Sequence, residues 1–264
     1  ALVELAHGER QLVWEFDAAG NRVGAALDSR AASEFVVDPD ARGHGHGARM
    51  LDMLTHPARG GAGGSKLFWA HGDHPASRAL ARHHKLEAVR TLLHLRLENL
   101  PAGSPGGDAF TPADADAWLA LNARTFASHP EQGAITRADL ETTMAEPWFD
   151  PADLLLLHRD GALIGYVWLK VHARTAATSL RDASEPASAA PAKDGEFYVV
   201  GVDPAHQHEG LGRLLMAAGF ARLAERGIHT AHLYVEADNE AAVRLYRELG
   251  FVDASVDIQY HYTR

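Results

Sequence analysis

Short runs of alternating apolar and polar residues dominate the first hundred positions, and this period-two pattern predicts β-strands. The turn at Ala18–Asn21 separates two of these runs as a hairpin loop would. Strands are expected over 11–16, 22–27, 33–37, 66–70 and 88–97, and helices over about 48–55 and 75–84. The segment 57–64, rich in glycine, predicts a loose connection between the first helix and the fourth strand.

The second half begins with a longer helical pattern. Thr111 is suited to cap a helix over 112–126, and a second helix is expected from Thr136. A hairpin over 154–158 and 163–171, a strand over 229–235, a helix over 240–249 and closing strands complete the pattern. The stretch 173–194 is rich in alanine, serine and proline and has no periodicity, so a mobile excursion is expected there.

One unit of the sequence occurs twice. Residues 36–47 (VVDPDARGHGHG) return without a gap, 165 positions later, as residues 201–212 (GVDPAHQHEGLG). The register continues downstream, where Asp73 is matched by Asp238. Two copies of a strand, a Gly-rich turn and a helix predict an α/β fold in two tandem domains. A linker of proline, glycine and serine divides them, which gives an N-terminal domain at 1–100, the linker at 101–110 and a C-terminal domain at 111–264.

The two copies differ in what precedes them. The second copy has 92 residues from Thr111 to Val202, whereas the first reaches Val37 from residue 1. After the excursion is subtracted, the difference corresponds to about two helices of ordinary length. The first domain is therefore expected to lack its N-terminal helices.

Both turns read Gln/Arg-x-x-Gly-x-Gly, with Gln207, Gly210 and Gly212 in one copy and Arg42, Gly45 and Gly47 in the other. Glycines at these steps let the backbone approach a ligand, and successive N–H groups at a helix start favour an anion. A diphosphate is the natural occupant. The dinucleotide fingerprint is absent, because Arg213 stands where a third glycine is needed, and no Gly-Lys-Ser/Thr is present.

The composition excludes several classes of binding partner and site. A net charge of −10 argues against binding to nucleic acid. The absence of cysteine excludes disulfides, thiolate metal sites and a cysteine nucleophile, and it fits a cytoplasmic protein. No apolar run is long enough to span a bilayer, and no leader pattern opens the chain, which starts at Ala1. A monomer without a membrane partner is expected.

The turn, the preceding Val-Asp-Pro and the segment Asn239–Tyr246 before Gly250-Phe251 resemble the GNAT N-acetyltransferases. The segments 129–133 (HPEQG), 147–151 (PWFDP), 168–172 (WLKVH), 198–204 (YVVGVDP) and 233–239 (LYVEADN) resemble the mycothiol synthases, a tandem-domain branch of that family. The resemblance implies two GNAT domains, each a mixed β-sheet flanked by helices. It also implies acetyl transfer from acetyl-CoA to a small-molecule acceptor, the cysteinyl amine of cysteinyl-glucosaminyl-inositol, giving mycothiol.

By this resemblance the Gly-rich turn holds the pyrophosphate of acetyl-CoA, and the helix that follows Asn239 lies against its pantetheine. The cofactor-binding residues that it implies in the second copy are Val200, Gly201, Val202, Gln207, His208, Glu209, Gly210, Leu211, Gly212, Arg213, Asn239, Glu240, Ala241, Ala242, Val243 and Arg244. In the first copy they are Phe35, Val36, Val37, Gly43, His44, Gly45, His46, Gly47 and Ala48. Glu209 stands at a commonly basic position, which would weaken attraction for the diphosphate.

The repeat register indicates which copy is catalytic. Acetyl transfer to an amine needs a base for the ammonium and an acid for the departing thiolate. Glu196, the candidate base, is matched by Ala31 in the first copy; Tyr246, the candidate acid, is matched by Ala81. The C-terminal domain is therefore expected to catalyse. Taken alone, a glutamate at a strand start is more often solvated, and a tyrosine before Gly-Phe is more often core packing.

The resemblance implies Glu131, Lys170, Glu196 and Tyr234 as acceptor contacts, although a strand lysine can also simply face solvent. Carboxylates suit the cationic amine and charged donors suit hydroxyls. The 17 histidines raise a metal hypothesis, but neighbours such as His44 and His46 rarely face one ion, so no metal is expected. Two alternative functions stay open: another tandem acetyltransferase for an aminoglycoside or peptide amine, and a non-catalytic acyl-CoA-binding protein.

Overall fold

The protein was analysed as a computed structural model, which describes residues 11–29, 32–55, 65–127, 129, 132–173 and 193–263. The chain forms two compact units. The N-terminal unit contains the described residues of 2–94, 235–239 and 253–264, and the C-terminal unit contains those of 95–234 and 240–252. The expected excursion over 173–194 lies almost entirely outside the described residues.

Within the N-terminal unit, strands and helices follow the predicted pattern closely. Its elements are β1 (Gln11–Phe16), β2 (Arg22–Asp28), β3 (Ala32–Val37), a 3-10 turn at Pro39–Ala41, α1 (His46–Thr55), β4 (Lys66–Ala70), α2 (Pro75–His83) and the first part of β5 (Glu87–Glu98). The described residues before Val37 form the strands β1, β2 and β3. Helix α1 begins two residues earlier than predicted, at His46.

The final strand of the chain belongs to the N-terminal unit's sheet. β11 (Val252–Tyr262) pairs antiparallel with β4, from Ile258 opposite Ala70 to Tyr262 opposite Lys66. The strand order in this unit is β1-β2-β3-β4-β11-β5. The neighbour of β4 is therefore supplied from the end of the sequence and not by β5, which follows α2 in the chain. Periodicity can predict a strand here, but it cannot tell which strand it pairs with.

The C-terminal unit contains most of the helices. Its elements are the last residues of β5, β6 (Asp108–Ala109), a 3-10 turn at Pro112–Asp114, α3 (Ala115–Thr125), a 3-10 turn at Gln132–Ala134, α4 (Arg137–Met144), β7 (Leu154–Arg159), β8 (Ala162–Ala173), β9 (Lys193–Val202), α5 (Leu211–Glu225), β10 (Thr230–Glu236) and α6 (Glu240–Glu248). The strand order is β5-β10-β9-β8-β7-β6. Thr111 and Asp114 form a capping box at the start of the 3-10 turn before α3, in agreement with the predicted cap.

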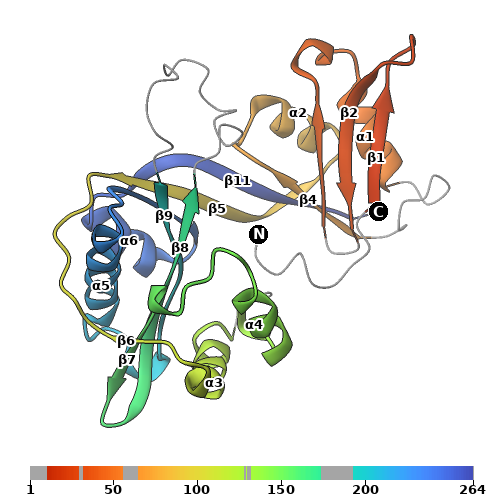
Figure 1. Cartoon of the computed structure of the whole chain (residues 1–264). Helices are drawn as coiled ribbons and strands as arrows, with labels where there is room; N and C mark the ends of the chain where they lie inside the picture. The colour runs from red at the N-terminus through yellow and green to blue at the C-terminus, as the bar shows by residue number, and fades with distance from the viewer. Residues whose placement is uncertain are drawn as a thin grey trace. The chain divides into compact units, whose positions relative to one another are not determined.

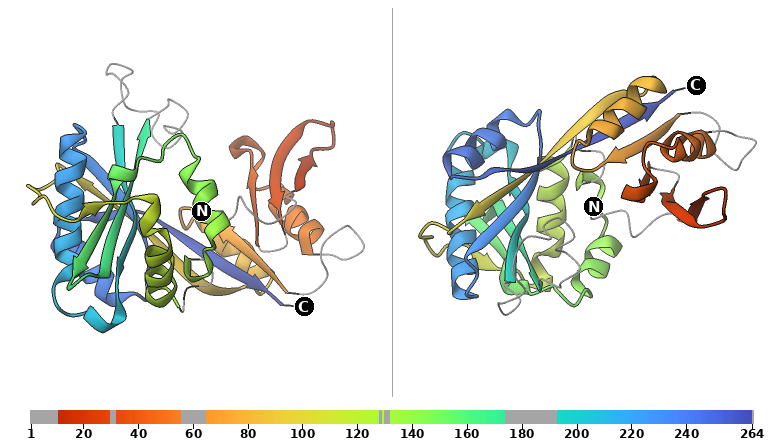
Figure 2. Two further views of the ribbon diagram at one scale, coloured as in Figure 1. Left: turned by 60° about the horizontal axis from the view of Figure 1, so that its bottom comes forward. Right: turned by 90° about the horizontal axis from the view of Figure 1, so that it is seen from above.

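Helices cover both faces of β8 and β9, as Figure 1 shows and the views in Figure 2 confirm. On one face lie α3 and α4, with an aromatic core that includes Trp118, Tyr166 and Trp168. On the other face lies α5, where Phe220 packs against Phe197. Because alternate residues of a strand face opposite sides of the sheet, β9 directs Glu196 toward the α3–α4 face and Phe197 toward α5.

The segment predicted as a linker packs closely on α5. Ser104 donates its backbone N–H to the Ala217 carbonyl at 3.1 Å. A Cβ atom at Gly103 would lie 2.1 Å from the Ala221 nitrogen, so the glycine is required by this close approach. Asp108 and Ala109 form the short strand β6 on β7. Residues 103–109 are thus part of the C-terminal unit's packing, which composition alone did not indicate.

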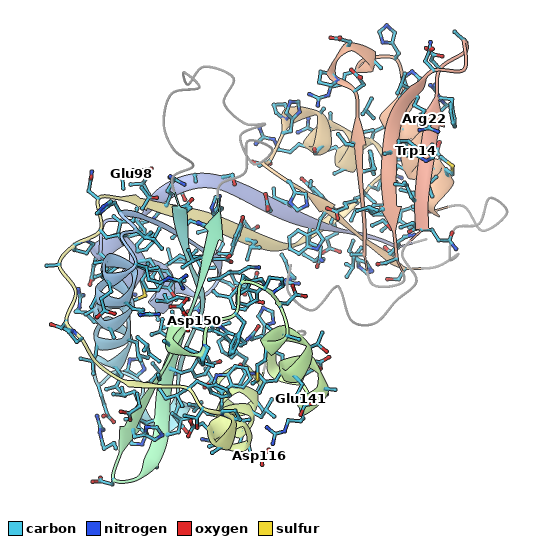
Figure 3. The ribbon with its side chains drawn as sticks, viewed as in Figure 1. Trp14, Arg22, Glu98, Asp116, Glu141 and Asp150 are labelled. Atoms are coloured by element: carbon cyan, nitrogen blue, oxygen red, sulfur yellow. The ribbon has the colours of Figure 1, made fainter. Side chains whose placement is uncertain are left out.

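In the N-terminal unit, the sheet buries Met50 and Leu51 of α1 together with Ala26, Phe68 and Tyr260. Large apolar side chains are exposed on its strands: Leu12, Trp14, Phe16, Leu27 and Val36. Figure 3 labels Trp14 and Arg22 on the β1–β2 hairpin, where the Arg22 guanidinium lies 4.6 Å from the Trp14 ring centre. The arginine covers part of the exposed ring through a cation–π contact.

Candidate functional site

The two Gly-rich turns have almost the same backbone. Asp38 and Asp203 cap equivalent 3-10 turns, with φ and ψ of −47° and 130° in the first copy and −52° and 130° in the second. Each carboxylate accepts the backbone N–H two residues later, at 2.9 Å and 3.0 Å. Gly45 and Gly210 both have positive φ, 84° and 79°. The repeated sequence therefore specifies one repeated conformation.

The last glycine of each turn makes room for a neighbouring helix. A Cβ atom at Gly47 would lie 3.0 Å from Leu80 Cδ1 of α2, and one at Gly212 would lie 3.1 Å from Leu245 Cδ2 of α6. Leu80 and Leu245 are themselves equivalent in the repeat. Sequence reasoning assigned these glycines to ligand approach alone and missed this packing role. The repeat of a leucine 33 residues after each glycine was the available signal.

In each unit, a parallel strand pair is joined only near its start. The described pairs are Ala32 and Ser33 of β3 with Leu67 and Phe68 of β4, and Gly195 and Glu196 of β9 with Ala231 and His232 of β10. Within the described ladder the following residues of β9, up to Val202, have no partner on β10. Backbone N–H and C=O groups of Val200, Gly201 and Val202, which were predicted to bind the cofactor, are thereby not used in that ladder.

The C-terminal unit has a β-bulge that the N-terminal unit lacks. Between β8 and β9, Trp168 pairs with Val199 and Leu169 pairs with Phe197, so Tyr198 is the extra residue. The equivalent ladder between β2 and β3 is regular from Gly24–Val37 to Asp28–Ser33. Bulges re-aim side chains next to functional sites. Here the bulged residue directly follows Phe197 and stands two positions after Glu196.

Lys170 and Glu196 are brought together as the sequence prediction required. They are opposite each other in the β8–β9 ladder, so their side chains share one face of the sheet. The Lys170 ammonium lies 4.4 Å from the Trp148 ring centre and 5.4 Å from that of Tyr198. Burial raises the pKa of the Tyr198 phenol, and the Glu196 and Glu146 carboxylates add to that shift. Trp148 and Tyr198 were not among the predicted site residues, although Trp148 lies in the quoted segment 147–151.

Tyr246 lies on the other side of β9 from Glu196. It is buried in α6, and its ring centre is 5.9 Å from that of Phe251, which in turn contacts Phe197. Burial raises the pKa of Tyr246 to about 12, so its phenol is protonated at neutral pH. Asn239 immediately precedes α6, and Glu240 to Arg244 form its first turns.

Of the two remaining predicted acceptor contacts, the structure describes Tyr234 but not Glu131. Tyr234 on β10 is 47% exposed, and its ring meets the His232 ring edge-on at 6.1 Å. In β10 the two residues alternate with buried Leu233, so they share a face. Glu131 lies outside the described residues. Three of the four predicted acceptor contacts thus occupy the adjacent strands β8, β9 and β10.

The carboxylate of Glu209 is neutralised by its neighbours. Arg159 at the end of β7 lies 2.5 Å from it, and His206 lies 3.2 Å away. The hydrogen bond from Arg159, followed by that from His206, lowers the pKa of Glu209. The expected weakening of diphosphate attraction is therefore offset by a guanidinium from a different strand, which the sequence spacing did not reveal.

Different side chains lie beside the Gly-rich turn of the first copy. His46 is buried, with its Nδ1 atom 3.0 Å from a Glu15 oxygen, and Arg49 reaches the same oxygen at 2.8 Å. His44 lies with its Nδ1 atom 3.3 Å from the Ala41 carbonyl. In the described part of the chain, no three histidine, aspartate or glutamate side chains are grouped to hold a metal ion. A search of the same residues finds no helix with the length and apolarity to cross a membrane.

Comparison with known proteins agrees with this arrangement. The acetyltransferase (GNAT) family matches residues 117–251. A mycothiol acetyltransferase of Clavibacter michiganensis subsp. michiganensis is 46% identical over 257 residues, which cover 91% of this chain and 76% of the relative. A mycothiol acetyltransferase of Streptomyces coelicolor is 43% identical over 239 residues, 87% of this chain and 70% of the relative.

Two solved structures share the fold. A GCN5-related N-acetyltransferase from Sphaerobacter thermophilus has a TM-score of 0.71 at 19% identity, over 96% of this chain and 80% of that one. A tandem GNAT protein from the clavulanic acid biosynthesis pathway has a TM-score of 0.61 at 17% identity, over 94% and 81%. The chain therefore belongs to the acetyltransferase (GNAT) family, among its members named mycothiol acetyltransferase, and it is an N-acetyltransferase.

Proposed function

We propose that the chain transfers the acetyl group of acetyl-CoA to the cysteinyl amine of cysteinyl-glucosaminyl-inositol, giving mycothiol. The observation that carries this proposal is the identity of 46% across 91% of the chain with a relative named for that product. The pair of Lys170 and Glu196 on the face shared with Tyr234 supports it. This face offers a carboxylate to a cationic amine and an ammonium to hydroxyl groups.

Glu196 is the proposed base. The acceptor enters as an ammonium, and the Glu196 carboxylate takes one proton from it, directly or through a water molecule. The free amine then attacks the acetyl carbonyl carbon, forming the C–N bond, and the nitrogen gives up its second proton to solvent. After the product leaves, Glu196 releases to solvent the proton that it took. The C–S bond of the thioester breaks as the tetrahedral intermediate collapses, and the electron pair leaves with the CoA sulfur.

Tyr246 is the proposed acid. Its buried phenol is protonated at neutral pH and can give its proton to the departing CoA thiolate. The phenol is restored by a proton from solvent after the product leaves. Because Glu196 and Tyr246 extend from opposite sides of β9, an acetyl group placed where β9 leaves β10 would have the base on one side and the acid on the other.

We propose that acetyl-CoA binds the C-terminal unit through the edge of Val200–Val202 that does not pair with β10 and through the turn at Gln207–Arg213. The first turns of α6 complete this site. The N-terminal turn is a second cofactor site by its backbone, formed by Phe35–Val37 and Gly43–Ala48. We propose that residues 1–100 form a domain that does not catalyse the reaction and that residues 111–264 form the catalytic domain.

The test is an assay of CoA release with cysteinyl-glucosaminyl-inositol beside a panel of aminoglycoside and peptide amines. The proposal expects kcat/KM at least about a hundredfold higher for cysteinyl-glucosaminyl-inositol than for any panel member, since a site built around specific hydrogen bonds discriminates strongly. Turnover of a panel amine alone would favour another acetyltransferase, and acetyl-CoA binding without turnover would favour a binding protein.

We further propose that the enzyme works as a monomer, because all the proposed catalytic groups lie within one unit of one chain, and that it works in the cytoplasm, with which a chain without cysteine is compatible. Light scattering at assay concentrations tests the first point. A mass of twice 28.5 kDa that persists on dilution would contradict it.

A further inference from the structure

A histidine lies between the proposed base and a second carboxylate. His232 of β10 is the register partner of Glu196 in the parallel ladder. Its Nε2 atom is 3.9 Å from Glu196 Oε2, and its Nδ1 atom is 3.5 Å from Asp194 Oδ2. The side chains of His232 and Glu196 are each 13% exposed, so this ion-pair geometry is largely shielded from solvent.

Asp194 is firmly held in this arrangement. Arg96 Nη1 lies 2.9 Å from one Asp194 oxygen, and the Thr230 hydroxyl donates to the other at 2.9 Å. Burial alone would raise the pKa of Asp194, but His232, Arg96 and Thr230 together hold it well below its usual range. Arg96 is itself paired with Glu98, which Figure 3 labels at the end of β5. Asp194 is therefore an ionised anchor for His232.

Further charged groups surround the histidine from every strand beside it. Lys170 on β8 stands opposite Glu196, and Arg96 and Glu98 belong to β5. Tyr234 meets the imidazole edge-on from β10 itself, and Glu146 acts on Tyr198 near Glu196. The Asp194 and Glu196 carboxylates carry like charges and would repel each other. The His232 ring lies between them, with one nitrogen toward each carboxylate.

The N-terminal copy lacks the whole arrangement. By the repeat register, His232 corresponds to Leu67, Asp194 to Ser29 and Glu196 to Ala31, although Ala31 lies outside the described residues. Leu67 is paired with Ala32 at the start of the equivalent parallel ladder. This pairing is offset by one residue from that of His232 with Glu196, and it forms without a histidine, so a parallel ladder does not require one there. This separates His232 from residues needed only for folding.

We propose that His232, anchored by Asp194, is a positioning residue that orients Glu196 and keeps it in the carboxylate form for the acceptor ammonium. The proposal rests on the assignment of Glu196 as base. The Nδ1 atom of His232 faces Asp194 at 3.5 Å, and a small side-chain rotation brings its Nε2 atom, now 3.9 Å from Glu196, into hydrogen-bond range. A proton held on the imidazole would offset the repulsion that the nearby Asp194 carboxylate exerts on an ionised Glu196.

The test compares pH profiles of kcat/KM for the wild type, His232→Leu, His232→Gln and Asp194→Asn. Leucine is the residue that the N-terminal ladder already accommodates. For His232→Leu we expect kcat/KM about tenfold lower at pH 7 and an acid limb moved upward by about one pH unit, since an opposite charge at this distance shifts a carboxyl pKa by about 1–3 units. His232→Gln, which can donate a hydrogen bond without charge, should recover part of kcat but not the acid limb. Asp194→Asn should move the acid limb downward, because it removes the like charge.

A double-mutant comparison separates positioning from folding. In a Glu196→Ala background, His232→Leu should have little further effect, because the histidine acts through Glu196. The matched control is His158→Gln, which removes a histidine paired with Asp108 at 3.2 Å on the β6–β7 edge and should leave the profile unchanged. An unmoved acid limb in His232→Leu, or an undiminished effect in the Glu196→Ala background, would overturn the proposal.

The experiments distinguish failure of the proposed function from failure of the proposal about His232. If another amine is the acceptor, the same profiles are measured with that amine. If Glu196→Ala retains full activity, the base assignment falls before the histidine is considered. A ¹³C NMR titration of protein labelled at glutamate measures the effect of His232 on the pKa of Glu196 without any turnover. The Glu196 signal is assigned through its loss in Glu196→Gln. A Glu196 titration that is identical in the wild type and His232→Leu would also reject the proposal.

Discussion

The two Gly-rich turns offer a comparison inside a single chain. Their backbones agree within a few degrees at the capping aspartate and in the φ of the first motif glycine, Gly45 or Gly210, yet the side chains around them differ. In the second copy, a bulge at Tyr198 follows Glu196, and Lys170 and His232 flank it. In the first copy the ladder is regular, and a leucine stands in place of His232. Main-chain geometry can thus persist while the side chains at a few strand positions change.

The first copy has a polar cluster of its own where the second is apolar. Buried His46 and Glu15 form a network with the half-exposed Arg49 at the start of α1, whereas the equivalent of His46 is the buried Leu211. Burial tends to raise the pKa of Glu15, but hydrogen bonds from Arg49 and His46 outweigh it and lower that pKa. These groups satisfy one another within the sheet and helix, which is the arrangement of a structural cluster.

The largest effect is expected from removing the proposed base or acid. Glu196→Ala should lower kcat/KM by about 10²–10⁴-fold, the range of general acid–base assistance. The loss should be greatest at low pH, where the acceptor is an ammonium, and should shrink as pH rises through the amine pKa. Tyr246→Phe should lower kcat by a similar factor while acetyl-CoA affinity, measured by calorimetry, stays nearly unchanged. Losses below about fivefold would remove either residue from its role.

A matched pair of glycine substitutions compares the two turns directly. Gly210→Ala and Gly45→Ala each force a side chain into the left-handed region, at φ of 79° and 84°, which costs about 1–2 kcal/mol. Gly210→Ala should raise the KM for acetyl-CoA about tenfold. Gly45→Ala should leave turnover within about twofold and alter only cofactor occupancy in the N-terminal unit. If Gly45→Ala abolishes turnover and Gly210→Ala does not, catalysis belongs to the other copy.

A smaller effect is expected at the ion pair beside the second turn. Arg159→Ala leaves the Glu209 carboxylate uncompensated near the expected diphosphate, so the KM for acetyl-CoA should rise about threefold at low salt and less at high salt. Glu209→Gln should lower it slightly, and the double variant should return close to the wild type. A rise in KM that does not depend on Glu209 would refute compensation by Arg159.

The smallest effect concerns pH and stability in the N-terminal unit. Hydrogen bonds to Asp257 and then Glu34 raise the pKa of His71 to about 9. An unfolded histidine titrates near 6.5, so the stabilisation is complete below about pH 6.5 and is lost as pH rises through 9. Because the ring is half exposed, its contribution is on the order of 1 kcal/mol.

His71→Gln should therefore lower the melting temperature at pH 6 and leave it unchanged at pH 9.5. His83→Gln, at an exposed position at the end of α2, is the control. An equal destabilisation by His71→Gln at both pH values would show that the imidazolium charge plays no part.

The sequence predicted local structure well where periodicity and turn residues act locally. β1 and β4 were predicted to the residue, and Thr111 was recognised as a cap. The candidate site was predicted in part, because Lys170 and Glu196 meet across one ladder as expected. Sequence reasoning missed the pairing of β11 with β4, the ion pair between Arg159 and Glu209, and the bulge at Tyr198. Each of these depends on which distant strand becomes a neighbour, and one sequence carries no local sign of that.

The place of β11 has a consequence for synthesis. A chain leaves the ribosome from its N-terminus, and N-terminal domains generally fold first. The N-terminal unit here cannot do so completely, because the partner of β4 is Ile258–Tyr262, which is made long after β4. Until then β4 has an open edge, the kind of strand that recruits other chains. Completion of this sheet must therefore wait for a segment made much later, and a nascent chain stalled before residue 258 would be the form most prone to aggregate.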